Sequence, residues 1–188
     1  MSSLFPIGLA SLQRDAAAGR KLPPVEKWNP AHCGEIDIRI ARDGTWYHLG
    51  TPIGRKELVR LFSTILRKDP DGFHLVTPVE KMRIRVDDVP FLAVLMDVAG
   101  DGRAQMLTFT TNVGDEVAAG PDNPIRVETH PASGEPAPYV HVRRGLEARM
   151  ARAVFYQLAD LAVPGEGADE GFLGVWSNGA FFRVGRPV

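Results

Sequence analysis

The stretch Cys33–Lys81, CGEIDIRIARDGTWYHLGTPIGRKELVRLFSTILRKDPDGFHLVTPVEK, decides the fold. Near its start, Ile36 to Ile40 alternate apolar and charged residues, the period of two that indicates a half-buried strand. The Asp43-Gly44 pair that follows predicts a tight turn. It should return the chain as a second strand from Trp46 to Leu49, so this part of the sequence predicts a β-hairpin.

A helix and a third strand complete this predicted unit. Thr51-Pro52 is typical of a helix start, and Asp69-Pro70-Asp71-Gly72 of a break. The chain should then return as a strand from Phe73 to Thr77. Between start and break, the apolar residues fall at i, i+3, i+4 and i+7, which predicts a helix that covers the hairpin. These residues are Leu58, Leu61, Phe62 and Ile65.

The second half reads as an antiparallel meander followed by a long loop region. Three strand-like runs come first, with turn residues between them: Met82 to Val86, Phe91 to Val98, and Ala104 to Thr110. The segment from Gly114 to Pro138 is rich in Gly, Pro, Asp and Asn. We expect it to be the loop region of the molecule, with one short strand around Ile125 to Glu128.

A pattern of the first half then recurs. Tyr139 to Val142 resembles Trp46 to Leu49, and Gly171 to Val175 echoes Gly72 to Val76. An Asn178-Gly179 turn predicts a final hairpin. The helix between has its apolar side at Met150, Ala153, Val154, Leu158 and Leu161. A duplicated hairpin, helix and strand unit explains the pattern, and chance similarity of two α+β segments explains it as well.

These elements predict an α+β protein with two similar lobes, each a mainly antiparallel sheet with a packed helix. The proposed division is a helix at Gly8 to Ala18 plus a linker (1–27), a first lobe (28–81) and a second lobe (82–188). The length of 188 residues is enough for two small domains.

Composition excludes several classes of function. The chain has 22 basic and 23 acidic residues, so no net field attracts nucleic acid or an anionic membrane. Nothing approaches the ~18 apolar residues of a membrane span, and the amino terminus lacks an export signal. The single cysteine, Cys33, cannot form an intramolecular disulfide. We therefore expect a cytoplasmic protein with neither a nucleic-acid nor a membrane partner.

The first half carries a dense run of unusual residues in order. It reads Trp28-x-Pro30-x-x-Cys33-Gly34-x-Ile36-Asp37-x-Arg39-Ile40-x-x-Asp43-Gly44-x-Trp46, then Thr51-Pro52-Ile53-x-Arg55 and Leu75-Val76-Thr77-Pro78-Val79-Glu80-Lys81. In these motifs the chain resembles an uncharacterised bacterial family, domain of unknown function number 1285, from about Trp28 to the carboxyl terminus. The resemblance implies a duplicated core, a second lobe loosely like a pleckstrin-homology domain, a nucleotide-like ligand between the two parts, and a signalling role.

Basic residues at the predicted helix starts are the main chemical signal. Arg55 and Lys56 fall in the first turn of one helix, and Arg143 and Arg144 at the entrance to the other, although a helix amino terminus favours anions. A phosphate or carboxylate there would be bound by guanidinium and free N–H groups together. The alternative is that these side chains bend into water or pair with Glu57 and Glu147.

Further candidates complete the predicted site. His48 and His141 each precede one basic pair, and Tyr47 could stack on a ligand ring, whereas Trp46 is better explained by core packing. Thr77 and Lys81 lie at the proposed junction, where salt bridging explains them equally well. The predicted ligand-binding residues are Arg39, Trp46, Tyr47, His48, Arg55, Thr77, Lys81, His141, Arg143 and Arg144.

No catalytic or metal motif is visible. The five histidines lack ligand spacing, so we predict neither a metal site nor a cofactor. His32 is poorly placed to activate the Cys33 thiol, because neighbouring residues on an extended chain point to opposite faces. The sequence thus favours a non-catalytic sensor or regulatory protein that binds a small anionic, nucleotide-like ligand between the lobes. The alternatives are a thiol-dependent enzyme or redox sensor using Cys33, and a protein-interaction module.

Overall fold

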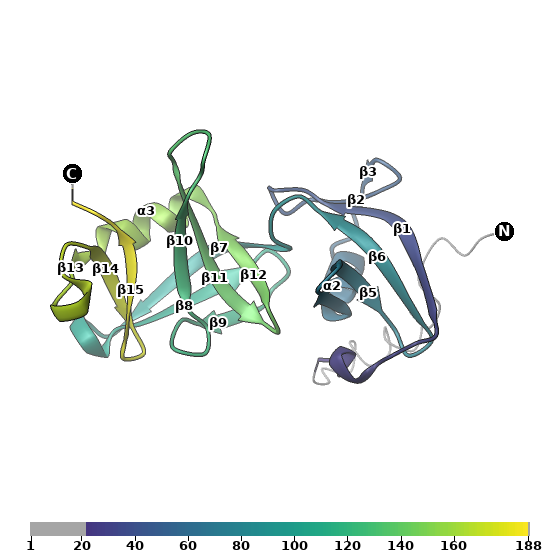
Figure 1. Cartoon of the computed structure of the whole chain (residues 1–188), viewed down its shortest axis with the longest axis horizontal. Coiled ribbons are helices and arrows are strands. Elements are labelled where there is room, and N and C mark those ends of the chain that lie inside the picture. The colour runs from purple at the N-terminus through teal and green to yellow at the C-terminus, as the bar shows by residue number, and fades with distance from the viewer. Residues whose placement is uncertain (1–21, 188) are drawn as a thin grey trace. The chain divides into compact units, whose positions relative to one another are not determined.

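The structure is a computed structural model that describes residues 22–187. The predicted helix at Gly8 to Ala18 lies outside the described residues. The chain divides into two compact units, Met1–Pro90 and Phe91–Val188, and each consists mostly of sheet with a single α-helix among the described residues (Figure 1). The predicted architecture of two sheet-rich lobes, each with a helix, is confirmed at this level. Within residues 22–187 no helix is long and apolar enough to cross a membrane.

The first unit contains a six-stranded sheet in the order β3-β2-β1-β6-β5-β4. All neighbouring strands are antiparallel except β1 and β6, which run parallel. A short 3-10 helix, η1 (Val25–Lys27), precedes the sheet. The elements are β1 (His32–Ile40), β2 (Trp46–His48), β3 (Thr51–Pro52), α2 (Lys56–Thr64), β4 (Leu66–Asp69), β5 (Gly72–Val76) and β6 (Glu80–Val86).

The predicted first hairpin is confirmed. Ile40 pairs with Trp46, and the turn between them is closed by a hydrogen bond of 2.9 Å from the Gly44 N–H to the Ala41 carbonyl. The Asp43 carboxylate accepts a hydrogen bond of 2.9 Å from the Thr45 N–H. This bond favours the charged form and lowers the pKa of Asp43. The Asp-Gly pair therefore acts through its side chain as well as through the positive φ of the glycine.

The predicted helix is shorter than the sequence indicated. Thr51-Pro52 forms β3, which pairs with β2, and the helix begins only at Lys56. At the other end the chain leaves the helix after Thr64 and forms β4, a strand that the sequence analysis missed. The predicted break at Asp69 to Gly72 is instead a two-residue β-hairpin turn, because Asp69 pairs directly with Gly72. Four residues of strand were too few to show a period of two.

Helix α2 packs on the apolar face of this sheet, as the stripe predicted (Figure 1). Leu61, Phe62 and Ile65 are buried, and Leu58 is half-buried. The rings of Trp46 and Phe62 stack with centroids 6.1 Å apart. Core packing is thus the structural role of Trp46. The remaining large, fully buried side chains of this core are Ile38, Ile40, Leu66 and Leu75.

The boundary between the units lies later than the sequence analysis placed it. Strand β6 pairs with both β1 and β5, so residues 82–86 belong to the first sheet and not to the second half. The division falls after Pro90, and the predicted boundary after Lys81 would cut β6. The parallel pairing of β1 with β6 connects segments far apart in sequence, which local patterns do not reveal.

The second unit contains a six-stranded sheet in the order β10-β11-β12-β7-β8-β9 and a three-stranded sheet, β13-β14-β15. The predicted loop region contributes β9, β10 and part of β11, and therefore holds more strand than expected. The elements are β7 (Phe91–Ala99), η2 (Gly102–Ala104), β8 (Met106–Thr111), β9 (Glu116–Ala118), β10 (Ile125–Thr129), β11 (Pro136–Arg143), β12 (Leu146–Met150), α3 (Arg152–Asp160), β13 (Val163–Pro164), η3 (Gly167–Asp169), β14 (Leu173–Ser177) and β15 (Ala180–Gly185).

Two buried polar residues connect the small sheet to the large one. The Ser177 hydroxyl accepts a hydrogen bond of 2.9 Å from the Leu107 N–H and donates one of 2.8 Å to the Ala119 carbonyl. The Gln105 side-chain amide donates to the Trp176 carbonyl at 2.8 Å. Because these groups are buried and paired, they fix the position of β14 beside β8.

The two six-stranded sheets share one topology. Each consists of two three-stranded antiparallel meanders, joined by parallel pairing of the first strand with the sixth: β1 with β6, and β7 with β12. The helix differs in position, since α2 lies between the meanders in sequence and α3 follows the second. The sequence pattern that suggested a repeat matched β2 with β11, which are not equivalent in this topology.

Candidate functional site

The face of the first sheet opposite α2 carries charged side chains on several neighbouring strands, and we call it the charged face. Lys81, Arg83 and Arg85 alternate along β6 and therefore point to one side. The strand register places His74 and Glu35 beside Arg83, and Arg39 beside Arg85. The charged face comprises Glu35, Asp37, Arg39, Arg67, Asp69, His74, Lys81, Arg83 and Arg85.

Asp69, at the end of β4, is held by two cations. Arg67 donates to both of its carboxylate oxygens, at 2.8 and 2.9 Å, and the Lys81 ammonium lies 3.1 Å from Oδ2. The Arg67 guanidinium also donates to the carbonyls of Val25 and Trp28, both at 2.8 Å. Partial burial raises the pKa of Asp69, but the hydrogen bonds from Arg67 and Lys81 outweigh it and lower the pKa overall.

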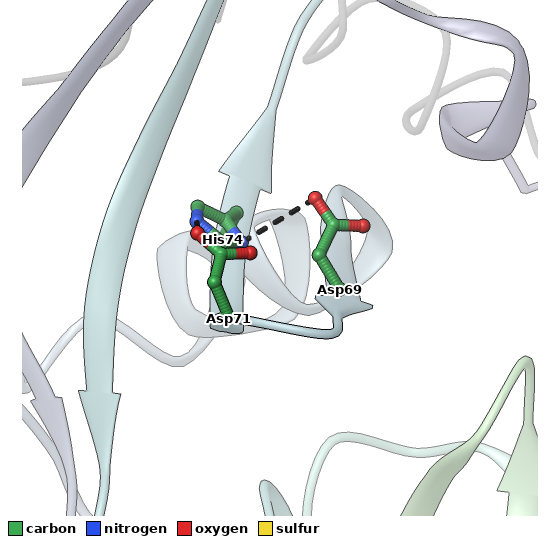
Figure 2. A group of neighbouring side chains, drawn as sticks. All are labelled: Asp69, Asp71 and His74. Atoms are coloured by element: carbon green, nitrogen blue, oxygen red, sulfur yellow. Dashed lines mark ion pairs between the residues drawn. The ribbon is translucent and has the colours of Figure 1, made fainter.

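His74 lies between two carboxylates (Figure 2). Its Nδ1 is 3.6 Å from Asp69 Oδ2, and its Nε2 is 3.4 Å from Asp71 Oδ2. The residue is only 2% exposed, and Nδ1 has no hydrogen-bond partner. Burial lowers the pKa of His74 below its ordinary value of 6.5, against the opposing effect of Asp71. Each ring nitrogen of His74 thus faces one carboxylate oxygen.

A pocket opens where β1 and β6 separate. Glu35 pairs with Arg83, and Arg39 pairs with Arg85. Between these two pairs β1 advances by four residues and β6 by only two, so β1 contains a bulge. This bulge leaves a pocket of about 570 Å³. Its lining consists of Glu35, Ile36, Asp37, Arg83, Ile84 and Arg85.

The two arginines of the pocket differ in their partners. Arg85 forms an ion pair of 2.6 Å with Asp37, and both side chains are substantially exposed, at 70% and 46%. Arg83 is exposed, and its guanidinium forms no hydrogen bond or ion pair with any residue of 22–187. Arg83 is thus the cation in this pocket that is available to a ligand.

Several predicted site residues of the first unit lie on the charged face. Arg39 pairs with Asp87 at 2.7 Å, and its guanidinium lies over the Tyr47 ring, 4.8 Å from the centroid. Lys81 belongs to the Asp69 cluster. Arg39 and Tyr47 therefore contact each other, whereas Lys81 lies at the other end of β6 and pairs with Asp69.

The other predicted residues of this unit lie elsewhere. Trp46 and Thr77 are fully buried, and the Thr77 hydroxyl accepts hydrogen bonds from the turn before β6. His48 pairs with Ile38 on the apolar side of the sheet. Arg55 is the exposed amino-terminal cap of α2, and its side chain makes no capping hydrogen bond. Among the described residues it has no ion pair, so it is not the structural partner of Asp37 or Glu57.

The prediction that Arg143 and Arg144 open a helix is wrong. Arg143 ends β11, and Arg144-Gly145 forms the hairpin turn into β12, with φ of 50° and 74°. The second helix begins only at Arg152. The run from Leu146 to Met150, read as the beginning of the helix, is a buried strand whose apolar residues alternate.

These second-unit residues are also engaged locally. Arg143 forms an ion pair with Asp115 and lies over the Phe91 ring, 5.0 Å from its centroid. His141 Nε2 accepts a hydrogen bond of 3.0 Å from the Gly145 N–H, and Nδ1 lies 3.1 Å from the Asp122 carbonyl. With Nε2 as the acceptor, His141 stabilises the hairpin turn at Arg144-Gly145. The helix start on which the predicted anion site of the second lobe rested is therefore not at Arg143 and Arg144.

The sequence analysis missed Arg83, Arg85 and the Asp69-Asp71-His74 group. The alternation Lys81-x-Arg83-x-Arg85 was a readable signal of a basic strand face, because the residues between are apolar. The Asp69-Asp71-His74 group gave no such signal, because the turn between the strands was a sufficient explanation for Asp69 and Asp71. Cys33, the proposed thiol, is exposed and is the strand partner of Lys81.

Comparisons with known proteins assign both units to one family. Residues 23–89 match the model described as "Domain of unknown function (DUF1285), N-terminal domain", and residues 90–184 match the corresponding C-terminal domain. A search of curated proteins found no match. A crystal structure of a DUF1285 family protein from Silicibacter pomeroyi DSS-3 is similar over 97% of both chains, with 54% identity and a TM-score of 0.85.

A second solved structure is more distant. A DUF1285 family protein from Shewanella baltica OS155 has 27% identity and a TM-score of 0.51. The similarity covers 65% of this chain and 90% of that one. The boundary between the two matched domains, after residue 89, agrees with the structural division after Pro90.

Proposed function

The chain belongs to the DUF1285 family, whose description names no activity, and we propose that it is a non-catalytic regulatory protein that binds a small anionic, nucleotide-like ligand. The observation that carries this proposal is the pocket between β1 and β6. Its wall contains the Arg83 guanidinium, which has no hydrogen bond or ion pair with the described residues. A volume of about 570 Å³ lies within the range of small-molecule sites, roughly 300–1,000 Å³.

The chemistry of the pocket favours a ligand that has both an anionic group and a neutral polar part. Arg83 offers a planar fork of donors that suits a phosphate or carboxylate. The ion pair of Arg85 with Asp37 is exposed, and such pairs contribute little stability, so a ligand can exchange for either partner. Glu35 and Asp37 add acceptors for hydroxyl or amino groups. A phosphorylated molecule with a sugar-like polar part combines these features.

A signalling role is the broader part of the proposal. The family resemblance implies a pleckstrin-homology-like second unit, and two antiparallel meanders followed by α3 support that comparison. Domains of this general build present sheet and loop surfaces to partners. A protein in which one unit binds a small molecule and the other a partner would act as a sensor.

The test begins with a thermal-shift screen of the full chain against nucleotides and other phosphorylated metabolites. A ligand present at a hundred times its Kd should add about 2.7 kcal/mol of stability. For a hit, Arg83→Ala should weaken binding roughly ten- to a hundredfold in calorimetric titration, because a charged hydrogen bond contributes about 1.5–3 kcal/mol.

Arg60→Ala is the matched control, since Arg60 is an exposed arginine of α2 outside the pocket. It should leave both affinity and melting temperature unchanged. If no anionic compound shifts the melting temperature, or if Arg83→Ala binds like the parent chain, the proposal fails.

The thiol alternative has one favourable observation, the exposure of Cys33. An enzyme or redox sensor needs a reactive thiolate. Alkylation of Cys33 at the rate of an ordinary free cysteine would count against this alternative, and a much faster reaction would favour it.

A further inference from the structure

We propose that Asp71 and His74 form a binding site for a divalent metal cation of the Zn²⁺ type, with Asp69 orienting the histidine ring. The site goes beyond the anion pocket and uses different residues. It is built on the β4-β5 hairpin, which brings the three side chains together within a short stretch of sequence (Figure 2).

Hydrogen-bond donors and acceptors around His74 are unequal in number. A neutral imidazole has one N–H donor and one lone pair, yet both ring nitrogens of His74 face carboxylates. One carboxylate therefore faces the lone pair of an imidazole ring that is itself only 2% exposed. Two acceptors facing each other leave room for a cation between them.

Asp69 is the carboxylate that takes the imidazole proton. It is already saturated by Arg67 and Lys81, so a metal ion would not displace these cations readily. Its Oδ2 faces Nδ1, the nitrogen without a hydrogen-bond partner. A small ring rotation would close the Nδ1–H contact of 3.6 Å. A carboxylate that orients the far nitrogen of a histidine is the usual outer partner of a metal ligand.

Asp71 then provides the second ligand. The distance of 3.4 Å between Nε2 and Asp71 Oδ2 suits two ligands of one ion. Adjacent ligand atoms of tetrahedral zinc, with bonds of about 2.0–2.1 Å, lie about 3.3–3.4 Å apart. Asp71 is 59% exposed, so water can occupy the remaining positions. Imidazole with carboxylate favours zinc or a similar transition metal over magnesium.

The spacing of the histidines alone does not indicate this site. The Asp71-x-x-His74 pair becomes adjacent through the hairpin, in which Asp69 pairs with Gly72.

The experiment uses the full chain with Cys33→Ser, which removes the exposed thiol as a competing zinc ligand. ZnCl₂ is titrated by calorimetry, and the ring nitrogens of ¹⁵N-labelled histidine are followed by NMR. We expect one ion per chain, with a shift of the His74 Nε2 resonance. Asp71→Asn should weaken binding by more than about a hundredfold, because loss of an outer partner alone costs ten- to a hundredfold.

Asp97→Asn is the matched control, since it removes an exposed carboxylate of β7 and should bind zinc like the parent. Arg83→Ala should also keep zinc binding, which separates this site from the anion pocket. Absence of saturable binding, equal binding by Asp71→Asn, or shifts confined to other histidines would each overturn the proposal.

Discussion

A leucine and an asparagine in two different hairpin turns share the left-handed backbone conformation. Leu49 and Asn178 both have φ of 48°, and each precedes a glycine in a two-residue hairpin turn. Asn178-Gly179 was predicted because asparagine tolerates the left-handed region. Leu49-Gly50 was not, because leucine gives no turn signal and avoids this conformation.

Leu49→Asn should therefore stabilise the protein. Leu49 is 63% exposed, so the change removes little buried apolar surface and relieves backbone strain of about 1 kcal/mol. Chemical denaturation should show a higher midpoint with an unchanged slope.

The reciprocal change, Asn178→Leu, provides the control and should lower the midpoint by at least as much. If both substitutions shifted stability in the same direction, backbone strain would not be the cause.

The candidate site also has some features that the sequence indicates and others that it does not. The basic character of Arg83 and Arg85 follows from sequence, but their pocket depends on a bulge in β1. A bulge is set by the pairing of two strands distant in sequence, and local patterns do not predict it. The prediction for Arg143 and Arg144 was wrong because it depended on where a helix begins. Helix boundaries are the least reliable feature of a sequence-based assignment.

Among the elements, α2 was predicted best because its signal is a complete apolar stripe. Three of its four predicted residues are buried against the sheet. Strands β3, β4 and β9 were missed, because each has at most four residues and too little alternation to be recognised. Strand β12 was mistaken for the start of a helix, since Met150 has helical spacing to Ala153 and Val154, although residues 146, 148 and 150 alternate as in a strand.

The packing of α2 gives a direct prediction. Leu61 is 4% exposed within the core of the first unit, so Leu61→Ala should cost about 2–5 kcal/mol through lost burial and the cavity left behind. Urea denaturation measures the loss. Arg60→Ala, on the exposed side of the same helix, should stay within about 0.5 kcal/mol of the parent. A small effect at Leu61 would mean that the helix is not packed as described.

For the whole molecule, the repeat exists in topology rather than in the matched sequence segments. Both sheets join two meanders by parallel pairing of the first and sixth strands. The first strand of such a sheet cannot complete its hydrogen bonding until the sixth has been reached. The six-stranded sheet is therefore the smallest complete unit. A domain boundary placed before the sixth strand would leave the hydrogen bonds of the first strand incomplete.

We therefore expect only fragments with a complete six-stranded sheet to fold. The fragment 1–90 contains all six strands of the first sheet and should give a dispersed NMR spectrum and a cooperative thermal transition. The fragment 1–81 keeps only the beginning of β6, which otherwise lies between β1 and β5 and buries Ile84. Its sheet would separate into two halves with unpaired edges, so it should be unfolded or aggregated.

The complementary fragments provide the control. The fragment 91–188 should fold, and 82–188 should fold equally well with residues 82–90 as an added tail, because the second sheet does not use them. A folded 1–81 fragment would show that β6 is dispensable to the first unit. In that case the parallel pairing of β1 with β6 could not be the connection that defines the unit, and the shared topology would lose its physical basis.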